Sequence, residues 1–130
     1  MGKVLIVDDD PQLRQSFEKL LIEEGLTVQT AANGEAGLAM VRESPPDLVV
    51  MDVRLPGING LEASRAMRKV APRLPIIIMT AYGTTETAIE ATKEGAFDYV
   101  LKPFNIPDIL ALVKDALEAG RLMHSRVEMD

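Results

Sequence analysis

KVLIVDDDPQL, residues 3–13, is the stretch that decides the fold, because it joins a strand directly to a helix. Its first half (KVLIVD, 3–8) is a short, β-branched apolar run, as expected for a buried strand. Asp10 followed by Pro11 then supplies a helix cap and a proline at the first helical position. The stretch therefore predicts the first strand–helix unit, with three consecutive aspartates, beginning at Asp8, where the strand ends.

The same strand–helix unit recurs along the rest of the chain, with glycine and proline between the units. The expected strands span residues 3–8, 26–31, 47–52, 76–80 and 97–101. The expected helices run from Pro11 to a stop at Gly25, from Asn33 to about Glu43, and over 60–70, 84–94 and 105–119. Strands alternating with helices imply a parallel sheet covered on both faces. Right-handed crossovers then favour an α/β flavodoxin-like (βα)5 doubly wound sandwich, whose five-stranded parallel sheet has the order 2-1-3-4-5.

Length and composition limit the number of domains and the kinds of partner that this chain can have. The 130 residues are enough for one compact domain, expected over 1–120, with 121–130 as a C-terminal tail or the start of a linker. The formal charge of −6 leaves no basic face, so direct binding of nucleic acid is not expected. No apolar run approaches the ~20 residues that span a bilayer, and no signal peptide is evident. With no cysteine either, the sequence indicates a cytoplasmic protein without a membrane partner.

Polar side chains stand at the carboxyl ends of the predicted strands. Asp8 and Asp9 end the first strand, Asp52 the third and Thr80 the fourth, while Lys102 follows the fifth. In a doubly wound sheet these ends share one edge, and sites form there beside the point where the strand order reverses. Since neighbouring strand residues point to opposite faces, Asp8 and Asp9 can both face the crevice only where the backbone turns.

Clustered carboxylates at that edge would need a cation. Two of them at ~4 Å repel by ~4 kcal/mol with an effective dielectric near 20. Oxygen ligands with room for water suit Mg²⁺. The Lys102 ammonium would add a second positive charge, so an anion brought to Asp52 would lie between a metal and an ammonium. That electrostatic arrangement is the one phosphoryl transfer needs, and a carboxylate is a known phosphoryl acceptor.

Four motifs carry a family resemblance: the Asp8-Asp9 pair, Asp52 in DVRLPGINGLE, Thr80-Ala81 after IIIM, and Lys102-Pro103-Phe104. In this order and spacing they resemble the receiver domain of two-component response regulators over nearly all of 3–119. The resemblance implies that Asp52 takes a phosphoryl group from a sensor histidine kinase. It also implies a phosphoryl acceptor that catalyses its own phosphorylation and dephosphorylation, rather than a turnover enzyme.

The resemblance also implies a role for each site residue. Asp9 and Asp52 would bind Mg²⁺ directly together with the backbone carbonyl of Arg54, and Asp8 would act through a metal-bound water. Lys102 and the Thr80 hydroxyl would contact the phosphoryl oxygens. Tyr99 matches the aromatic residue whose ring position reports phosphorylation. The surface of the fourth helix, fifth strand and fifth helix would then change, controlling an output domain or a homodimer.

Residues 79–104 resemble more specifically the receivers of NtrC-type sigma-54-dependent transcription activators. That class joins the receiver to an ATPase domain and a DNA-binding domain, which implies transcription activation as the output. Neither output domain is present in this sequence. The chain therefore fits either an excised receiver or a free-standing regulator.

Some of the same residues also fit other functions. The pair Asp8 and Asp10 superficially fits an aspartate-nucleophile phosphohydrolase of the haloacid-dehalogenase type, although Pro11 replaces the expected small residue. A flavodoxin-like FMN binder would need a phosphate loop after the first strand, where this chain is acidic. A pseudo-receiver would bind a partner without taking phosphate. Tyr99, alternating with Phe97, also fits ordinary strand packing.

Overall fold

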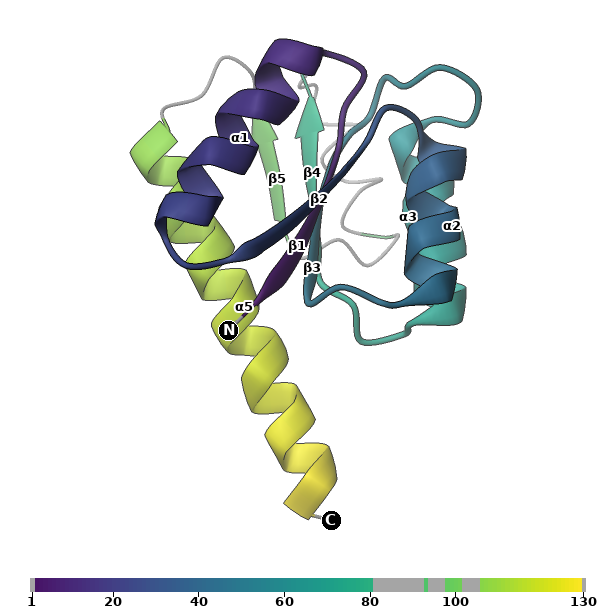
Figure 1. Ribbon diagram of the computed structural model, residues 1–130. Helices are drawn as coiled ribbons and strands as arrows, with labels where there is room; N and C mark the ends of the chain where they lie inside the picture. Colours follow the sequence, from purple (N-terminus) through teal and green to yellow (C-terminus); the bar gives the residue numbers. More distant parts are fainter. Residues whose placement is uncertain (1, 81–92, 94–97, 102–105, 130) are drawn as a thin grey trace.

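The computed structural model describes residues 2–80, 93, 98–101 and 106–129. Strands and helices alternate through most of this part of the chain (Figure 1). The strands are β1 (Lys3–Val7), β2 (Thr27–Ala31), β3 (Leu48–Asp52), β4 (Ile76–Thr80) and β5 (Asp98–Leu101). The helices are α1 (Pro11–Glu23), α2 (Gly34–Glu43), α3 (Gly60–Val70) and α5 (Ile106–Met129). The helix expected over 84–94 lies outside the described residues, apart from Lys93.

The five strands form one parallel sheet in the order β2-β1-β3-β4-β5, which confirms the predicted doubly wound topology. Helices α1 and α5 cover one face of the sheet, and α2 and α3 cover the other (Figure 1). The order of the strands reverses at β1, so the point between β1 and β3 is where a site is expected in this architecture.

Two apolar cores, one on each face, hold the layers together. Side chains alternate along each central strand, so that Val4 and Ile6 of β1 belong to the core under α1 and α5, while Leu5 and Val7 belong to the other. Strands β1, β3 and β4 are buried on both faces, as their continuous apolar runs predict. The β2 side chains are more exposed, consistent with its place at the edge of the sheet.

Capping residues set the helix boundaries. The Asp10 carboxylate accepts from the backbone N–H groups of Gln12 (2.9 Å) and Leu13 (3.4 Å) at the start of α1. Asn33 does the same for α2, accepting from the N–H of Ala36 at 2.7 Å. Gly25 follows α1 with φ of 85°, a conformation that favours glycine at a helix end. These caps confirm the predicted helix starts and the stop after α1.

Helix α5 is longer than expected. The helix was expected over 105–119, with a tail or linker from 121, whereas it continues through Met129 and extends past the sheet (Figure 1). A glycine inside a helix costs only about 1 kcal/mol relative to alanine. Residues 121–129 include several good helix formers, which sustain the helix beyond Gly120. Within the part of the chain described, no helix has the length and apolar character needed to cross a membrane.

Candidate functional site

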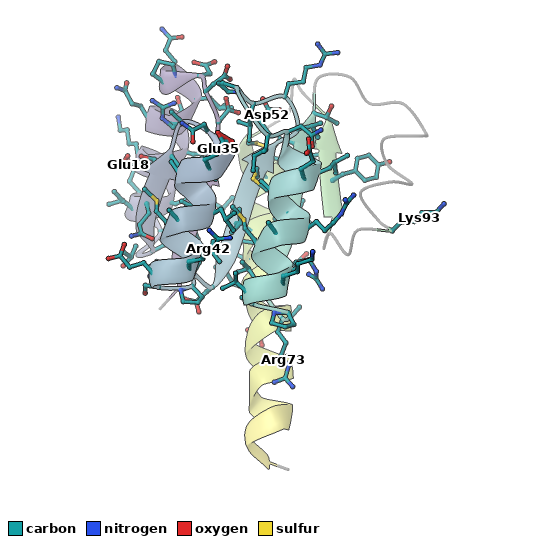
Figure 2. The ribbon with its side chains drawn as sticks, turned by 90° about the vertical axis from the view of Figure 1, so that its right-hand side faces the viewer. Glu18, Glu35, Arg42, Asp52, Arg73 and Lys93 are labelled. Atoms are coloured by element: carbon teal, nitrogen blue, oxygen red, sulfur yellow. The ribbon has the colours of Figure 1, made fainter. Side chains whose placement is uncertain are left out.

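Three carboxylates meet at the carboxyl ends of β1 and β3. Val7 is paired with Met51, so the next residues, Asp8 and Asp52, leave adjacent strands at the same level. One carboxylate oxygen from each of Asp8, Asp9 and Asp52 lies within 4.8 Å of the others. The side chains of Asp8 and Asp52 are 0% and 7% exposed, whereas Asp9 is exposed. Figure 2 shows Asp52 at the end of the domain opposite Arg73.

The end of β1 is fixed by its own hydrogen bonds. The N–H of Asp8 donates to the Ala31 carbonyl (3.1 Å), and the N–H of Asp10 donates to the Asp8 carboxylate (2.9 Å). The Arg14 guanidinium, one turn into α1, donates to the Asp8 carbonyl at 2.6 Å. Arg14 was not among the residues predicted for the site. Only its position in the first turn after the aspartates could have suggested it.

Hydrogen bonds fix both ends of the loop that connects β3 to α3. The N–H of Val53 donates to the Met79 carbonyl (2.9 Å), and the N–H of Gly60 donates to the Val53 carbonyl (2.7 Å). A Cβ on Gly60 would collide with the carbonyl oxygen of Asp52, so glycine is required there. Arg54, whose carbonyl is the expected metal ligand, lies in this connection with its side chain exposed.

Thr80 and Tyr99 occupy the same face of the sheet. Thr80 ends β4 and is 2% exposed. Tyr99 of β5 is paired with Ile78, and Ile78 and Thr80 share a face because side chains repeat every second residue. Tyr99 is 39% exposed. The remaining residues of the last two motifs lie outside the described residues: Ala81, Lys102, Pro103 and Phe104.

This donor set could hold a metal ion. Three carboxylates bring only oxygen ligands, which a hard divalent cation prefers. Burial of Asp8 and Asp52 weakens the screening of their mutual repulsion, and a cation would relieve it. The exposure of Asp9 leaves the mouth of the site open to water, so a cation that keeps part of its hydration shell fits.

The fold and the acidic site thus define a doubly wound α/β protein with a carboxylate cluster at the switch point. The family described as "Response regulator receiver domain" matches residues 4–114, and the chain belongs to this family. It is a receiver domain of a two-component response regulator, related to NtrC-type activators. The resemblance inferred from the motifs is confirmed, and the dehalogenase and flavodoxin readings are set aside.

Related proteins point to the same group of regulators. The chain is 39% identical over 118 residues to the regulatory protein AtoC of Escherichia coli K12, covering 91% of this chain and 26% of AtoC. It is 41% identical over 116 residues to the DNA-binding transcriptional regulator NtrC of Salmonella typhimurium, covering 89% of this chain and 25% of NtrC. The chain thus spans about a quarter of the length of these curated relatives.

Solved structures agree with the fold. The response regulator receiver domain protein from Clostridium thermocellum has a TM-score of 0.88 at 32% identity, covering 95% of this chain and 99% of that one. NtrX from Brucella abortus has a TM-score of 0.91 at 30% identity, covering 98% of this chain and 29% of the NtrX chain. The domain therefore resembles both free receiver domains and the receiver part of a longer regulator.

Proposed function

We propose that this domain accepts a phosphoryl group on Asp52 from a sensor histidine kinase, with Mg²⁺ as cofactor. The observation that carries the proposal is the convergence of the Asp8, Asp9 and Asp52 carboxylates within 4.8 Å at the ends of β1 and β3. Asp52 is the member of the cluster that ends β3 at the switch point, beside the open side formed by Asp9. The match of its surrounding motif, DVRLPGINGLE, to the receiver family is what selects Asp52 over Asp8 and Asp9 as the acceptor.

The family resemblance implies a role for each residue in this transfer. A carboxylate oxygen of Asp52 attacks the phosphorus of a phosphohistidine; the new P–O bond forms as the P–N bond breaks, and the imidazole leaves. Asp9, Asp52 and the Arg54 carbonyl would hold Mg²⁺, and Asp8 would hold one of its waters. The ion supplies positive charge beside the phosphoryl oxygens. Lys102 and the Thr80 hydroxyl would contact the same oxygens.

The same domain would promote both formation and hydrolysis of its aspartyl phosphate. Because the phosphoryl group would stay on Asp52 until it is hydrolysed, the domain would act as a self-modifying acceptor rather than as a turnover enzyme.

Phosphorylation would act on an output domain by changing the surface of the receiver that contacts it. Thr80 drawn toward the phosphoryl group leaves space on the face that it shares with Tyr99, and the Tyr99 ring would turn inward to fill it. The surface formed by residues 84–94, β5 and α5 would then control ATPase and DNA-binding output domains, or a homodimer, in the cytoplasm. Residues 1–120 would form the receiver, with 121–130 leading toward the output domain. The receiver itself would contact neither nucleic acid nor membrane.

Mass spectrometry of the intact protein tests the acceptor. Incubation with acetyl phosphate and Mg²⁺ should add one phosphoryl group, which hydroxylamine removes because it cleaves acyl phosphates. The variant Asp52→Asn should lose the main labelling, and omission of Mg²⁺ should suppress labelling of the wild type. Equal labelling of Asp52→Asn would overturn the assignment. Absence of labelling in the wild type would favour a pseudo-receiver.

A further inference from the structure

Glu35, the second residue of α2, contacts the loop that follows Asp52. Its carboxylate accepts a hydrogen bond from the backbone N–H of Ile58 at 2.9 Å. The same carboxylate lies against Gly57, where a Cβ would collide with it. Figure 2 shows Glu35 near the end of α2 that lies toward Asp52, with Arg42 farther along the helix. Glu35 therefore joins two elements that are far apart in the sequence, at the edge of the sheet that carries the acidic cluster.

The loop over 53–59 depends on such a support. Its two ends are fixed by the hydrogen bonds from Val53 to Met79 and from Gly60 to Val53. Gly57 has φ of 77°, a conformation that glycine adopts without strain, so this part of the backbone has little intrinsic stiffness. Near the end of the loop, the Glu35 carboxylate of α2 accepts from the Ile58 N–H at 2.9 Å, and the Glu62 carboxylate of α3 accepts from the Asn59 N–H at 3.4 Å.

Packing strengthens the same junction. A Cβ on Gly34, the residue before Glu35, would lie 2.9 Å from the Ile58 side chain, so the first turn of α2 sits directly on the loop. A carboxylate acceptor makes a stronger hydrogen bond to an N–H group than a neutral one. Its negative charge is also favourable in the first turn of a helix. Glu35 is thus held in place by its own helix while it holds the loop.

We propose that Glu35 is a positioning residue for phosphoryl transfer. By fixing the loop over 53–59 it holds the backbone carbonyl of Arg54 toward the carboxylate cluster and so sets the affinity for Mg²⁺. The inference rests on the proposed function, because it concerns the same site. Glu35 does not touch the reacting atoms; it acts through the backbone of the loop.

The test compares Glu35→Ala, Glu35→Gln and the control Glu43→Ala, which removes an exposed carboxylate from the other end of α2. The Kd for Mg²⁺ is measured by NMR titration, and acetyl phosphate labelling is followed over a range of Mg²⁺ concentrations. Because Glu35 contacts the loop four residues from Arg54, Glu35→Ala should weaken Mg²⁺ binding by up to about tenfold, the lower end of the effect of losing a direct partner of a metal ligand. Glu35→Gln keeps an acceptor oxygen but loses the charge, so its Kd for Mg²⁺ should lie between those of wild type and Glu35→Ala, whereas Glu43→Ala should match wild type.

Saturating Mg²⁺ should restore the labelling rate of Glu35→Ala, an effect that a purely structural role would not produce. A lower melting temperature of Glu35→Ala with an unchanged Kd for Mg²⁺ would overturn the inference. So would equal losses in Glu35→Ala and Glu35→Gln, which would assign the effect to charge. Failure of the proposed function is seen separately, because wild-type protein would then take no phosphoryl group.

Discussion

At the scale of single residues, three consecutive aspartates do three different things. Asp8 is buried and accepts from the N–H of Asp10, Asp9 is exposed at the mouth of the cluster, and Asp10 caps α1. The difference comes from the turn of the backbone after Val7, which ends the alternation of the strand. Identical side chains thus acquire distinct surroundings within one turn of chain.

Removing one carboxylate of the cluster should change how the protein responds to Mg²⁺. Asp9→Ala should melt higher than wild type without metal, because repulsion with Asp8 and Asp52 is relieved, and it should lose its response to Mg²⁺. Wild type at a tenfold excess of Mg²⁺ over its Kd should gain about 1.4 kcal/mol, or roughly 5 °C in melting temperature. Thermal unfolding followed by circular dichroism, with Mg²⁺ and with EDTA, measures both effects.

The control for this experiment is Asp115→Ala, which removes an exposed carboxylate of α5. Its melting temperature should rise with Mg²⁺ as in wild type. A full Mg²⁺ response in Asp9→Ala would argue against Asp9 as a ligand.

At the scale of elements, α3 begins where the site loop ends. The Asn59 side chain accepts from the N–H of Glu62 at 2.9 Å, and the Glu62 carboxylate accepts from the N–H of Asn59 at 3.4 Å. This capping box was not anticipated, although Asn59 and Glu62 are spaced as such a motif requires. It fixes the start of the helix directly beside Gly60, where the backbone passes closest to Asp52.

Replacing the cap should destabilise the whole domain through α3. Asn59→Ala should lower the free energy of unfolding by about 1 kcal/mol, whereas Asn59→Gly should cost only a few tenths, because glycine is an acceptable cap. Urea unfolding at equilibrium measures both values. Equal stability of Asn59→Ala and wild type would show that the capping box contributes nothing to stability.

At the scale of the whole molecule, the acidic cluster lies at the carboxyl ends of β1 and β3, whereas the surface that would signal includes β5, which β4 separates from β3 in the sheet. Thr80 and Tyr99 share the face of the sheet opposite α1 and α5, and Tyr99 retains substantial exposure. A displacement of Thr80 would therefore reach solvent through β5. Coupling of this kind requires an element with two arrangements of similar energy.

Beryllofluoride, a phosphoryl mimic, should reveal that coupling. With Mg²⁺ it should change NMR chemical shifts at Tyr99 and over residues 84–94, in addition to those around Asp52. Sedimentation of both states should show a change in self-association if this face forms a homodimer. Asp52→Asn, which lacks the acceptor oxygen, should show neither effect. Shifts confined to the loops around Asp52, with an unchanged oligomeric state, would contradict the switch and leave the acceptor chemistry intact.

The sequence by itself determined the order of the strands, most helix starts and the meeting of Asp8, Asp9 and Asp52. These features depend on local rules, namely apolar runs, capping residues and the shared edge of parallel strand ends. Tertiary structure alone decided the contacts of Arg14 with Asp8 and of Glu35 with Ile58. Both contacts depend on how far a flexible side chain reaches across a junction between elements, which local sequence patterns do not specify.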